Sequence, residues 1–148
     1  MVKGLSGGWG TCFHTVLSGG ITNALACYKD IIAVGVCDHP IIILNAITGS
    51  QIATLSGDTD WVESLAFSPD RTSLVSGNLH GTVELWDVQT GGVVKTFNGH
   101  TSGVTSVSIS ADCTMVASGS QDSTIRFWDI QKGDCCCIIG HQGFVQHV

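Results

Sequence analysis

Short stretches of the chain alternate hydrophobic and polar residues, and turn-forming residues separate them. Residues 62–67 follow a period of two and stop at the turn tetrapeptide Ser68-Pro69-Asp70-Arg71. Such a pattern, bounded by turn residues, predicts a half-buried β-strand. Three more strands follow in the same way, at 73–77, 82–87 and 93–97. The pattern predicts a unit of four short strands joined by turns.

The whole unit recurs along the chain. Trp86-Asp87 returns 42 residues later as Trp128-Asp129, and Gly35, Gly77 and Gly119 are also spaced by 42. The pairs Gly57-Asp58, Gly99-His100 and Gly140-His141, and the polar residues Asp38, His80 and Asp122, keep the same register. Repeats of about 40 to 45 residues with Gly-His and Trp-Asp dipeptides indicate four-stranded propeller blades.

The register divides the chain into an N-terminal lead-in, 1–11, and a repeat segment, 12–148. The segment comprises a lone outer strand at 12–17, blades at 21–55, 61–97 and 103–139, and the start of a new inner strand at 144–148. We therefore expect an all-β chain of three four-stranded antiparallel blades with partial strands at both ends, which is an incomplete propeller.

On these motifs, residues 12–148 resemble the WD-repeat β-propeller family, including the repeat arrays of fungal signalling NTPases. The resemblance implies a hydrogen-bonded tetrad of His, Ser or Thr, Asp and Trp in each repeat. The third repeat supplies the complete set, which is His100, Ser118, Asp122 and Trp128. Each hydrogen bond of such a buried network contributes about 0.5 to 1.5 kcal/mol.

The other repeats depart from this tetrad. The second repeat offers Asp58, Ser76, His80 and Trp86, with the Asp and His at exchanged positions. The exchange either restores an Asp–His bond with reversed polarity or reflects decay. The first repeat keeps only Asp38, so packing alone is expected to hold its blade.

Three blades are too few to close a ring, because propellers have about four to eight blades. We expect a fragment, a truncated product or an assembly that a partner completes, with apolar faces that favour self-association.

Charge and composition narrow the range of partners and locations. The net charge is −6, and the six Lys and Arg residues form no cluster, so neither nucleic acid nor an acidic membrane is an expected partner. No apolar stretch has the length of a signal peptide or a membrane span, and the seven cysteines show no disulfide framework. A cytoplasmic location is expected, and a nuclear one is the alternative.

Two groups of residues invite a chemical interpretation. Cys135–Cys137 with His141, or Cys37 with His39, resemble metal ligands, but they lack the paired spacing of a zinc site. Ser118, His100 and Asp122 have the residue types of a hydrolase triad, but the resemblance places them in a buried structural network. We predict no enzyme, cofactor or metal, and keep a hydrolytic or metal-dependent enzyme as an alternative.

The resemblance also implies a docking face, formed by the loops that join blades and the turns between the second and third strands. Trp61 and Phe144 hold equivalent positions there, either as anchors for a partner or as shields for a strand edge. The expected partner-binding residues are Trp61, Glu63, Leu79, His80, Thr105, Gln121, Phe144 and Gln146. The predicted function is a protein-interaction scaffold for a protein or peptide partner, and a sensor array of a multidomain signalling protein is the alternative.

Overall fold

The computed structural model describes residues 21–57 and 61–148, which form twelve β-strands and no helix. The first four are β1 (Thr22–Tyr28), β2 (Ile31–Val36), β3 (Ile41–Asn45) and β4 (Gln51–Leu55). The next are β5 (Val62–Phe67), β6 (Ser73–Asn78), β7 (Thr82–Asp87) and β8 (Val93–Asn98). The last are β9 (Val104–Ile109), β10 (Met115–Ser120), β11 (Thr124–Asp129) and β12 (Cys135–Gly140). The predicted all-β fold class is confirmed.

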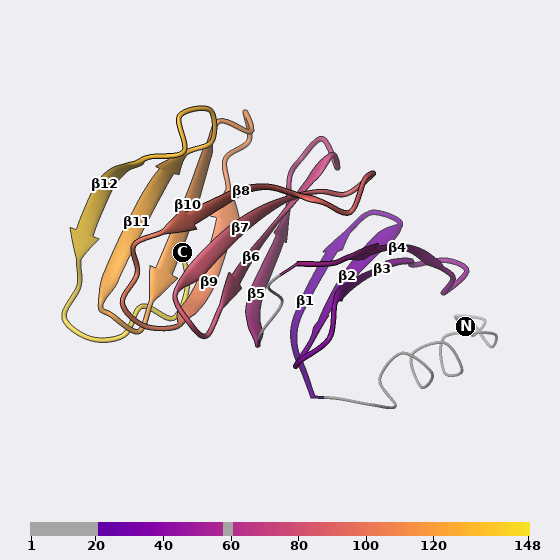
Figure 1. Cartoon of the computed structure of the whole chain (residues 1–148), viewed down its shortest axis with the longest axis horizontal. Helices are drawn as coiled ribbons and strands as arrows, with labels where there is room; N and C mark the ends of the chain where they lie inside the picture. The colour runs from indigo at the N-terminus through magenta and orange to yellow at the C-terminus, as the bar shows by residue number, and fades with distance from the viewer. Residues whose placement is uncertain (1–20, 58–60) are drawn as a thin grey trace, which may run out of the picture.

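Each set of four strands forms one antiparallel sheet in chain order, as expected of a propeller blade. The three sheets follow one another across the molecule, from β1–β4 on the right of Figure 1 to β9–β12 on the left. Their inner strands adjoin, since β5 contacts both β1 and β9. The outer strands β4, β8 and β12 are the opposite edges of the sheets. Turns β2–β3, β6–β7 and β10–β11 therefore lie at the same end as the loops that join sheets.

Two hydrophobic cores fill the spaces between neighbouring sheets. Trp86 is fully buried in the first core, with Ile41 and Ile43 of the preceding sheet. Trp128 belongs to the second core, where its ring lies 5.6 Å from that of Phe97 in β8. Each tryptophan thus packs its own sheet against the sheet before it, so burial of these rings holds the stack together.

A glycine in the second strand of each sheet allows the segment that follows that sheet to approach closely. A Cβ atom on Gly77 would lie 2.4 Å from Cγ1 of Val104, and one on Gly119 would lie 2.6 Å from Cγ1 of Val145. These distances leave no room for a side chain. The recurring glycine of the sequence repeat is explained by sheet-to-sheet packing.

The first sheet is the least regular one. Its β1–β2 turn consists of Lys29 and Asp30 alone, so Thr22 stands opposite Val36 in the place that Val62 takes in the second sheet. Val34 and Leu44, which occupy tetrad positions, are both buried in an aliphatic cluster. Apolar packing replaces the polar network in this sheet.

The two predicted terminal strands have different outcomes. Residues 12–17, together with the lead-in 1–11, lie outside the described residues. Residues 144–148 form no strand, but Val145 is buried, its N–H donates to Ser120 O at 3.1 Å and Val148 N donates to Ser106 Oγ at 3.0 Å. These isolated bonds place the segment beside β9 and β10 without a ladder, and its interpretation as the start of a strand stays a prediction.

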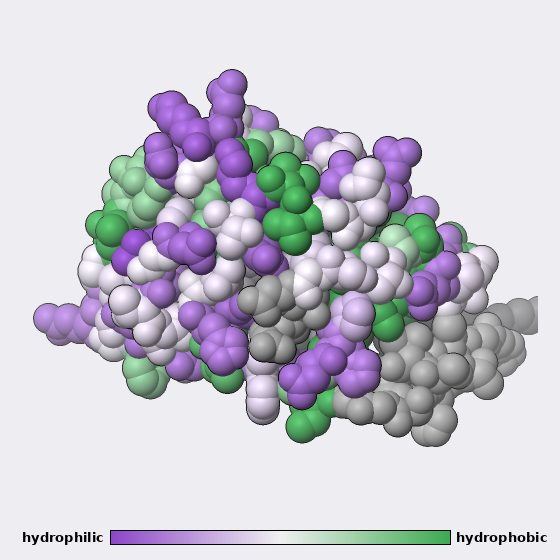
Figure 2. All heavy atoms as spheres, in the orientation of Figure 1, coloured by the Kyte–Doolittle hydropathy of each residue, from purple (hydrophilic) through white to green (hydrophobic). Residues whose placement is uncertain are grey.

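Apolar side chains are exposed along the last strand. Ile138 and Ile139 of β12 are 54% and 47% accessible, and Figure 2 shows hydrophobic areas over β12 and β8 within a mostly hydrophilic face. Within the described parts of the chain, no helix has the length and apolarity that crossing a membrane requires.

Candidate functional site

The four predicted tetrad residues of the third repeat come from four different elements. His100 lies in the loop before β9, Ser118 in β10, Asp122 in the β10–β11 turn and Trp128 in β11. The Gly99 backbone permits this arrangement, because a Cβ there would lie 3.2 Å from the Trp128 ring and 2.5 Å from Nη1 of Arg126. The Gly-His dipeptide thus gives the indole room and then places the imidazole beside it.

Hydrogen bonds join the four side chains in one direction. Trp128 Nε1 donates to Ser118 Oγ at 2.8 Å, and Ser118 Oγ lies 2.7 Å from His100 Nε2. His100 Nδ1 lies 2.8 Å from Asp122 Oδ2. Because a carboxylate only accepts, Nδ1 carries the histidine proton and Nε2 accepts from the serine hydroxyl. Every polar atom along this path is satisfied.

The surroundings fix the charge of both ionisable members. Burial lowers the pKa of His100, and this effect outweighs the Asp122 carboxylate, which raises it. Burial raises the pKa of Asp122, but hydrogen bonds from Thr124, the Thr101 N–H and His100 together hold it well below the ordinary value. At neutral pH the network therefore contains a neutral imidazole and a carboxylate.

Two partners of Asp122 were not among the residues expected from the sequence. Thr101 N donates to Asp122 Oδ2 at 3.0 Å, and the hydroxyl and N–H of Thr124 donate to Oδ1 at 2.6 and 2.9 Å. A threonine two residues after a turn aspartate is a local signal for this motif. These bonds anchor the loop before β9 and the start of β11 to one carboxylate.

The second repeat retains half of this network. Trp86 Nε1 donates to Ser76 Oγ at 2.8 Å, and both side chains are buried. His80 lies exposed at the β6–β7 turn, while Asp58 lies outside the described residues, so the exchanged Asp–His pair stays a prediction. In the first repeat Asp38 is exposed and has a positive φ of 57°.

The residue types of a hydrolase triad occur here without an open cleft. Ser118 is fully buried, and its hydroxyl is engaged by both His100 and Trp128. A nucleophilic serine needs access to substrate and an oxyanion hole beside it. The geometry favours a structural role for this network.

The cysteine and histidine residues do not converge on a metal site. Among the described residues, no group of three or more His, Cys, Asp or Glu side chains is arranged to hold an ion. Cys135 Sγ and Cys136 Sγ approach main-chain carbonyls, those of Cys137 and Phe127. His39 Nδ1 lies 2.7 Å from the carbonyl of Cys37, not from its thiol.

The eight predicted partner-binding residues, which we call the loop rim, line one end of the sheets. Leu79 N donates to the Trp61 carbonyl at 3.1 Å, which joins the second turn of one sheet to the loop before it. Gln121 N donates to Gly103 O at 2.9 Å in the same way one sheet later. The Thr105 hydroxyl donates to the carbonyl of Val145, beside Phe144 and Gln146. Contacts between main-chain and short side-chain groups thus link the successive parts of the loop rim.

Exposure within the loop rim is uneven. Phe144 is 69% accessible and Trp61 39%, and His80 and Gln146 are exposed as well. Glu63, Leu79, Thr105 and Gln121 are half-buried. Trp61 has a φ of 44°, a left-handed conformation that is rare for an aromatic residue and costs about 1 to 3 kcal/mol. The fold holds this backbone while the indole remains accessible.

Comparison with known families gives a match over residues 49–87 and 91–129 to the model of the WD40 family, described as WD domain, G-beta repeat. Two curated proteins align over part of the chain. Lissencephaly-1 homolog 1 of Paramecium tetraurelia is 35% identical over 52 residues, and Periodic tryptophan protein 2 of Arabidopsis thaliana is 35% identical over 59 residues. The alignments cover 35% and 40% of this chain, but only 13% and 7% of those proteins.

Solved structures share the arrangement of the sheets. The computationally designed Ika4 protein is 32% identical, with a TM-score of 0.77 over 87% of this chain and 79% of its own. The WD40 repeats of RRP9 are 21% identical, with a TM-score of 0.80 over 87% of this chain and 42% of that chain. The second likeness concerns the fold alone.

Proposed function

The chain belongs to the WD-repeat family, and we propose that it is a non-catalytic scaffold that binds a protein or peptide partner at the loop rim. Propellers of this family generally mediate protein–protein interactions and are typically not enzymes. Fold alone does not fix function, so the proposal rests on the site itself.

The observation that carries the proposal is the pair of accessible aromatic side chains at the loop rim. Trp61 and Phe144 are 39% and 69% accessible and hold equivalent places two repeats apart, with Gly103 at the place between them. Large aromatic side chains on a rigid frame are enriched among the residues that dominate binding energy. The strained φ of Trp61 supports the same role, because strain concentrates at functional positions.

Composition supports a protein partner over the other classes. The net charge of −6 disfavours nucleic acid and anionic lipid surfaces. We include in the proposal a cytoplasmic location, with the nucleus as the second candidate, because the spacings of the seven cysteines in the sequence show no disulfide framework.

A second candidate is a sensor or regulatory WD-repeat array of a multidomain signalling protein, with its outer strands covered by another domain. The exposed Ile138 and Ile139 of β12 favour it, because apolar groups on an outer strand gain from being covered. A second copy of the chain would cover them equally well. Solution mass measured over a range of protein concentrations distinguishes self-association from a purely monomeric scaffold.

Capture of partners on immobilised protein tests the loop rim. Wild type, Trp61→Ala and Phe144→Ala are compared by quantitative mass spectrometry of the captured proteins. We expect one set of proteins to be lost in both variants. Truncation of an aromatic anchor commonly costs about 2 kcal/mol or more, which weakens binding roughly thirtyfold.

Ile47→Ala is the matched control. Ile47 is 78% accessible and lies in the β3–β4 turn, at the end of the sheets opposite the loop rim. Circular dichroism checks that each variant keeps its fold. Equal capture by wild type and both aromatic variants, or equal loss in the Ile47 variant, would count against a docking surface at the loop rim.

A further inference from the structure

A lysine bridges the second and third sheets at the end opposite the loop rim. Lys95 in β8 donates through Nζ to the main-chain carbonyls of Ile130 and Gln131, each at 2.9 Å. Both carbonyls belong to the β11–β12 turn of the next sheet. Gly133 of this turn packs on the lysine, since a Cβ there would lie 3.2 Å from both Cδ and Nζ of Lys95. The turn thus provides a receptor for one ammonium group.

The preceding pair of sheets has the same receptor without its lysine. Ala53 pairs with Ile43 in the register in which Lys95 pairs with Leu85. Val88 and Gln89 of the β7–β8 turn correspond to Ile130 and Gln131. The first sheet therefore has Ala53 at the position that Lys95 holds in the second sheet.

The two turns have the same main-chain conformation. Gly91 N donates to Asp87 O at 2.9 Å, and Gly133 N donates to Asp129 O at 2.8 Å. The φ angles of the two glycines are 74° and 83°. The carbonyls of Val88 and Gln89 are therefore presented as those of Ile130 and Gln131 are, yet within the described residues no hydrogen bond is donated to either.

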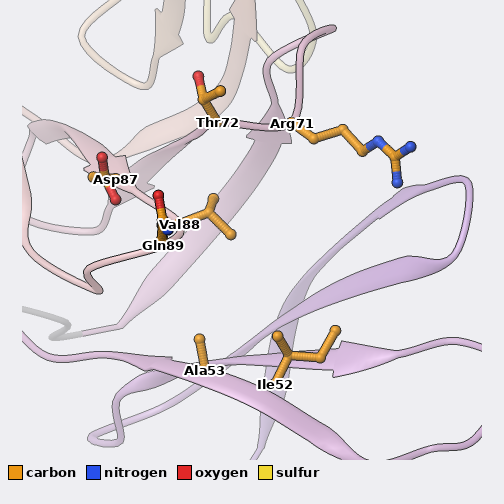
Figure 3. Close-up of a pocket in the computed structure, with 7 residues that line it drawn as sticks. All are labelled: Ile52, Ala53, Arg71, Thr72, Asp87, Val88 and Gln89. Atoms are coloured by element: carbon orange, nitrogen blue, oxygen red, sulfur yellow. The ribbon is translucent and has the colours of Figure 1, made fainter.

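A cleft of about 440 Å³ lies where the lysine would be, and we call it the Ala53 cleft. Figure 3 shows Ile52 and Ala53 of β4 facing Val88 and Gln89 across it, with Asp87 beside them. The remaining lining residues are Arg71 and Thr72. The turn touches β4 nearby, because a Cβ on Gly91 would lie 2.6 Å from the carbonyl oxygen of Thr54. This contact holds the two walls of the cleft against each other.

The chemistry of the lining suits a cationic side chain with an apolar stem. Ile52 and Ala53 form an apolar wall, and the unpaired carbonyls and the Asp87 carboxylate are acceptors only. Hydrogen bonds from Thr90 hold the pKa of Asp87 below its ordinary value, so the group is anionic at neutral pH. The charge of Arg71 is balanced by Asp30 at 2.7 Å, and in Figure 3 the guanidinium extends away from Ala53 and Val88.

We propose that the Ala53 cleft receives the ammonium group of a lysine side chain from a partner protein, in the place that Lys95 fills one sheet further along. The net charge of −6 favours the approach of a lysine-bearing partner. The cleft lies at the opposite end of the sheets from the loop rim, so this inference and the proposed function can fail separately.

The test is a titration of the labelled protein with the tripeptide Gly-Lys-Gly, blocked at both ends and followed by amide chemical shifts. We expect saturable shifts at Ala53, Gln89 and Thr90. The same tripeptide with an Nε-acetylated lysine keeps the stem but lacks the charge. We expect it to bind about tenfold more weakly or worse, because each charge-assisted hydrogen bond is worth at least that factor.

Two variants complete the design. Ala53→Lys supplies the missing lysine from the chain itself, so the peptide shifts at Gln89 should disappear while the melting temperature rises. Lys95→Ala opens the matched cleft, so a second set of saturable shifts should emerge at Gln131. The absence of saturable shifts at Gln89 in the wild type, or equal binding of the acetylated peptide, would overturn the proposal.

Discussion

Removing one hydroxyl group, in Ser118→Ala, measures what the tetrad contributes to stability. Ser118 is fully buried, accepts from Trp128 Nε1 at 2.8 Å and lies 2.7 Å from His100 Nε2. The substitution leaves one donor and one acceptor buried without a partner. Each such group costs about 1 to 3 kcal/mol, so we expect the free energy of unfolding to fall by about 2 to 6 kcal/mol.

Ser76→Ala is the internal control, because it removes the equivalent hydroxyl in the second repeat. Ser76 accepts from Trp86 Nε1 at 2.8 Å. Among the described residues this variant leaves only that donor without a partner, so the free energy of unfolding should fall by only about 1 to 3 kcal/mol. Urea denaturation followed by far-ultraviolet circular dichroism gives both values under the same conditions. The difference between the variants isolates the histidine side of the network.

The prediction is tested most directly by the order of the two losses of stability, which should be larger for Ser118→Ala than for Ser76→Ala. If Ser118→Ala costs no more than Ser76→Ala, then the bond between His100 and Ser118 contributes nothing to stability. If Ser118→Ala changes the free energy of unfolding by less than about 0.5 kcal/mol, the tetrad contributes no more to stability than an ordinary surface residue does. Either result would remove the energetic argument for a structural network.

Acid should destabilise the protein in two steps. Burial lowers the pKa of His100 in the folded state, so the unfolded chain binds a proton at this histidine more readily. The stability that is present above about pH 6.5 is therefore lost as the pH falls toward the folded pKa. Urea titrations at several pH values measure this loss, and it should be smaller in His100→Gln. The pKa of Asp122 is also lowered by folding, so a further loss should begin below about pH 3.9 and be absent in Asp122→Asn. Gly77→Ala places a Cβ 2.4 Å from Val104 Cγ1 and should lower the free energy of unfolding, measured by denaturant titration, by about 1 to 3 kcal/mol. In the control Gly92→Ala the nearest atom is 3.7 Å from the Cβ, so the loss should be under about 1 kcal/mol. Equal losses in the two variants would contradict the packing role of Gly77.

The repeat made the fold predictable from the sequence. The markers at 42-residue spacing fix the register of every strand around them, and a one-residue slip would turn Trp86 or Trp128 from the core to the solvent face. The tetrad of the third repeat was predicted from the resemblance to the WD-repeat family, whose motif positions are matched by His100, Ser118, Asp122 and Trp128. The alternation of hydrophobic and polar residues alone does not predict the hydrogen bond between His100 and Asp122, which are 22 positions apart.

The positions that the sequence missed are those where a repeat departs from its neighbours in size or polarity. A strand pattern does not distinguish Lys95 from any other outer-strand lysine, or Ala53 from any other alanine, because it does not tell which side chain crosses to the next sheet. The shortened β1–β2 turn likewise shifted Thr22 into the place of Val62. Contacts between sheets decide these features, and periodicity within one sheet does not report them.

The loop rim and the Ala53 cleft are separated by the length of a strand. Strands of six residues, such as β5 and β8, span about 20 Å at 3.3 Å per residue. Trp61 also precedes the inner strand β5, whereas Ala53 lies in the outer strand β4, so an extended partner segment that contacts both sites must cross the width of a sheet as well. A shorter peptide engages only one end, so substitutions at Trp61 and Ala53 should act on separate ligands. In a longer partner both substitutions weaken one ligand, and their free energies add because the two sites share no side chain.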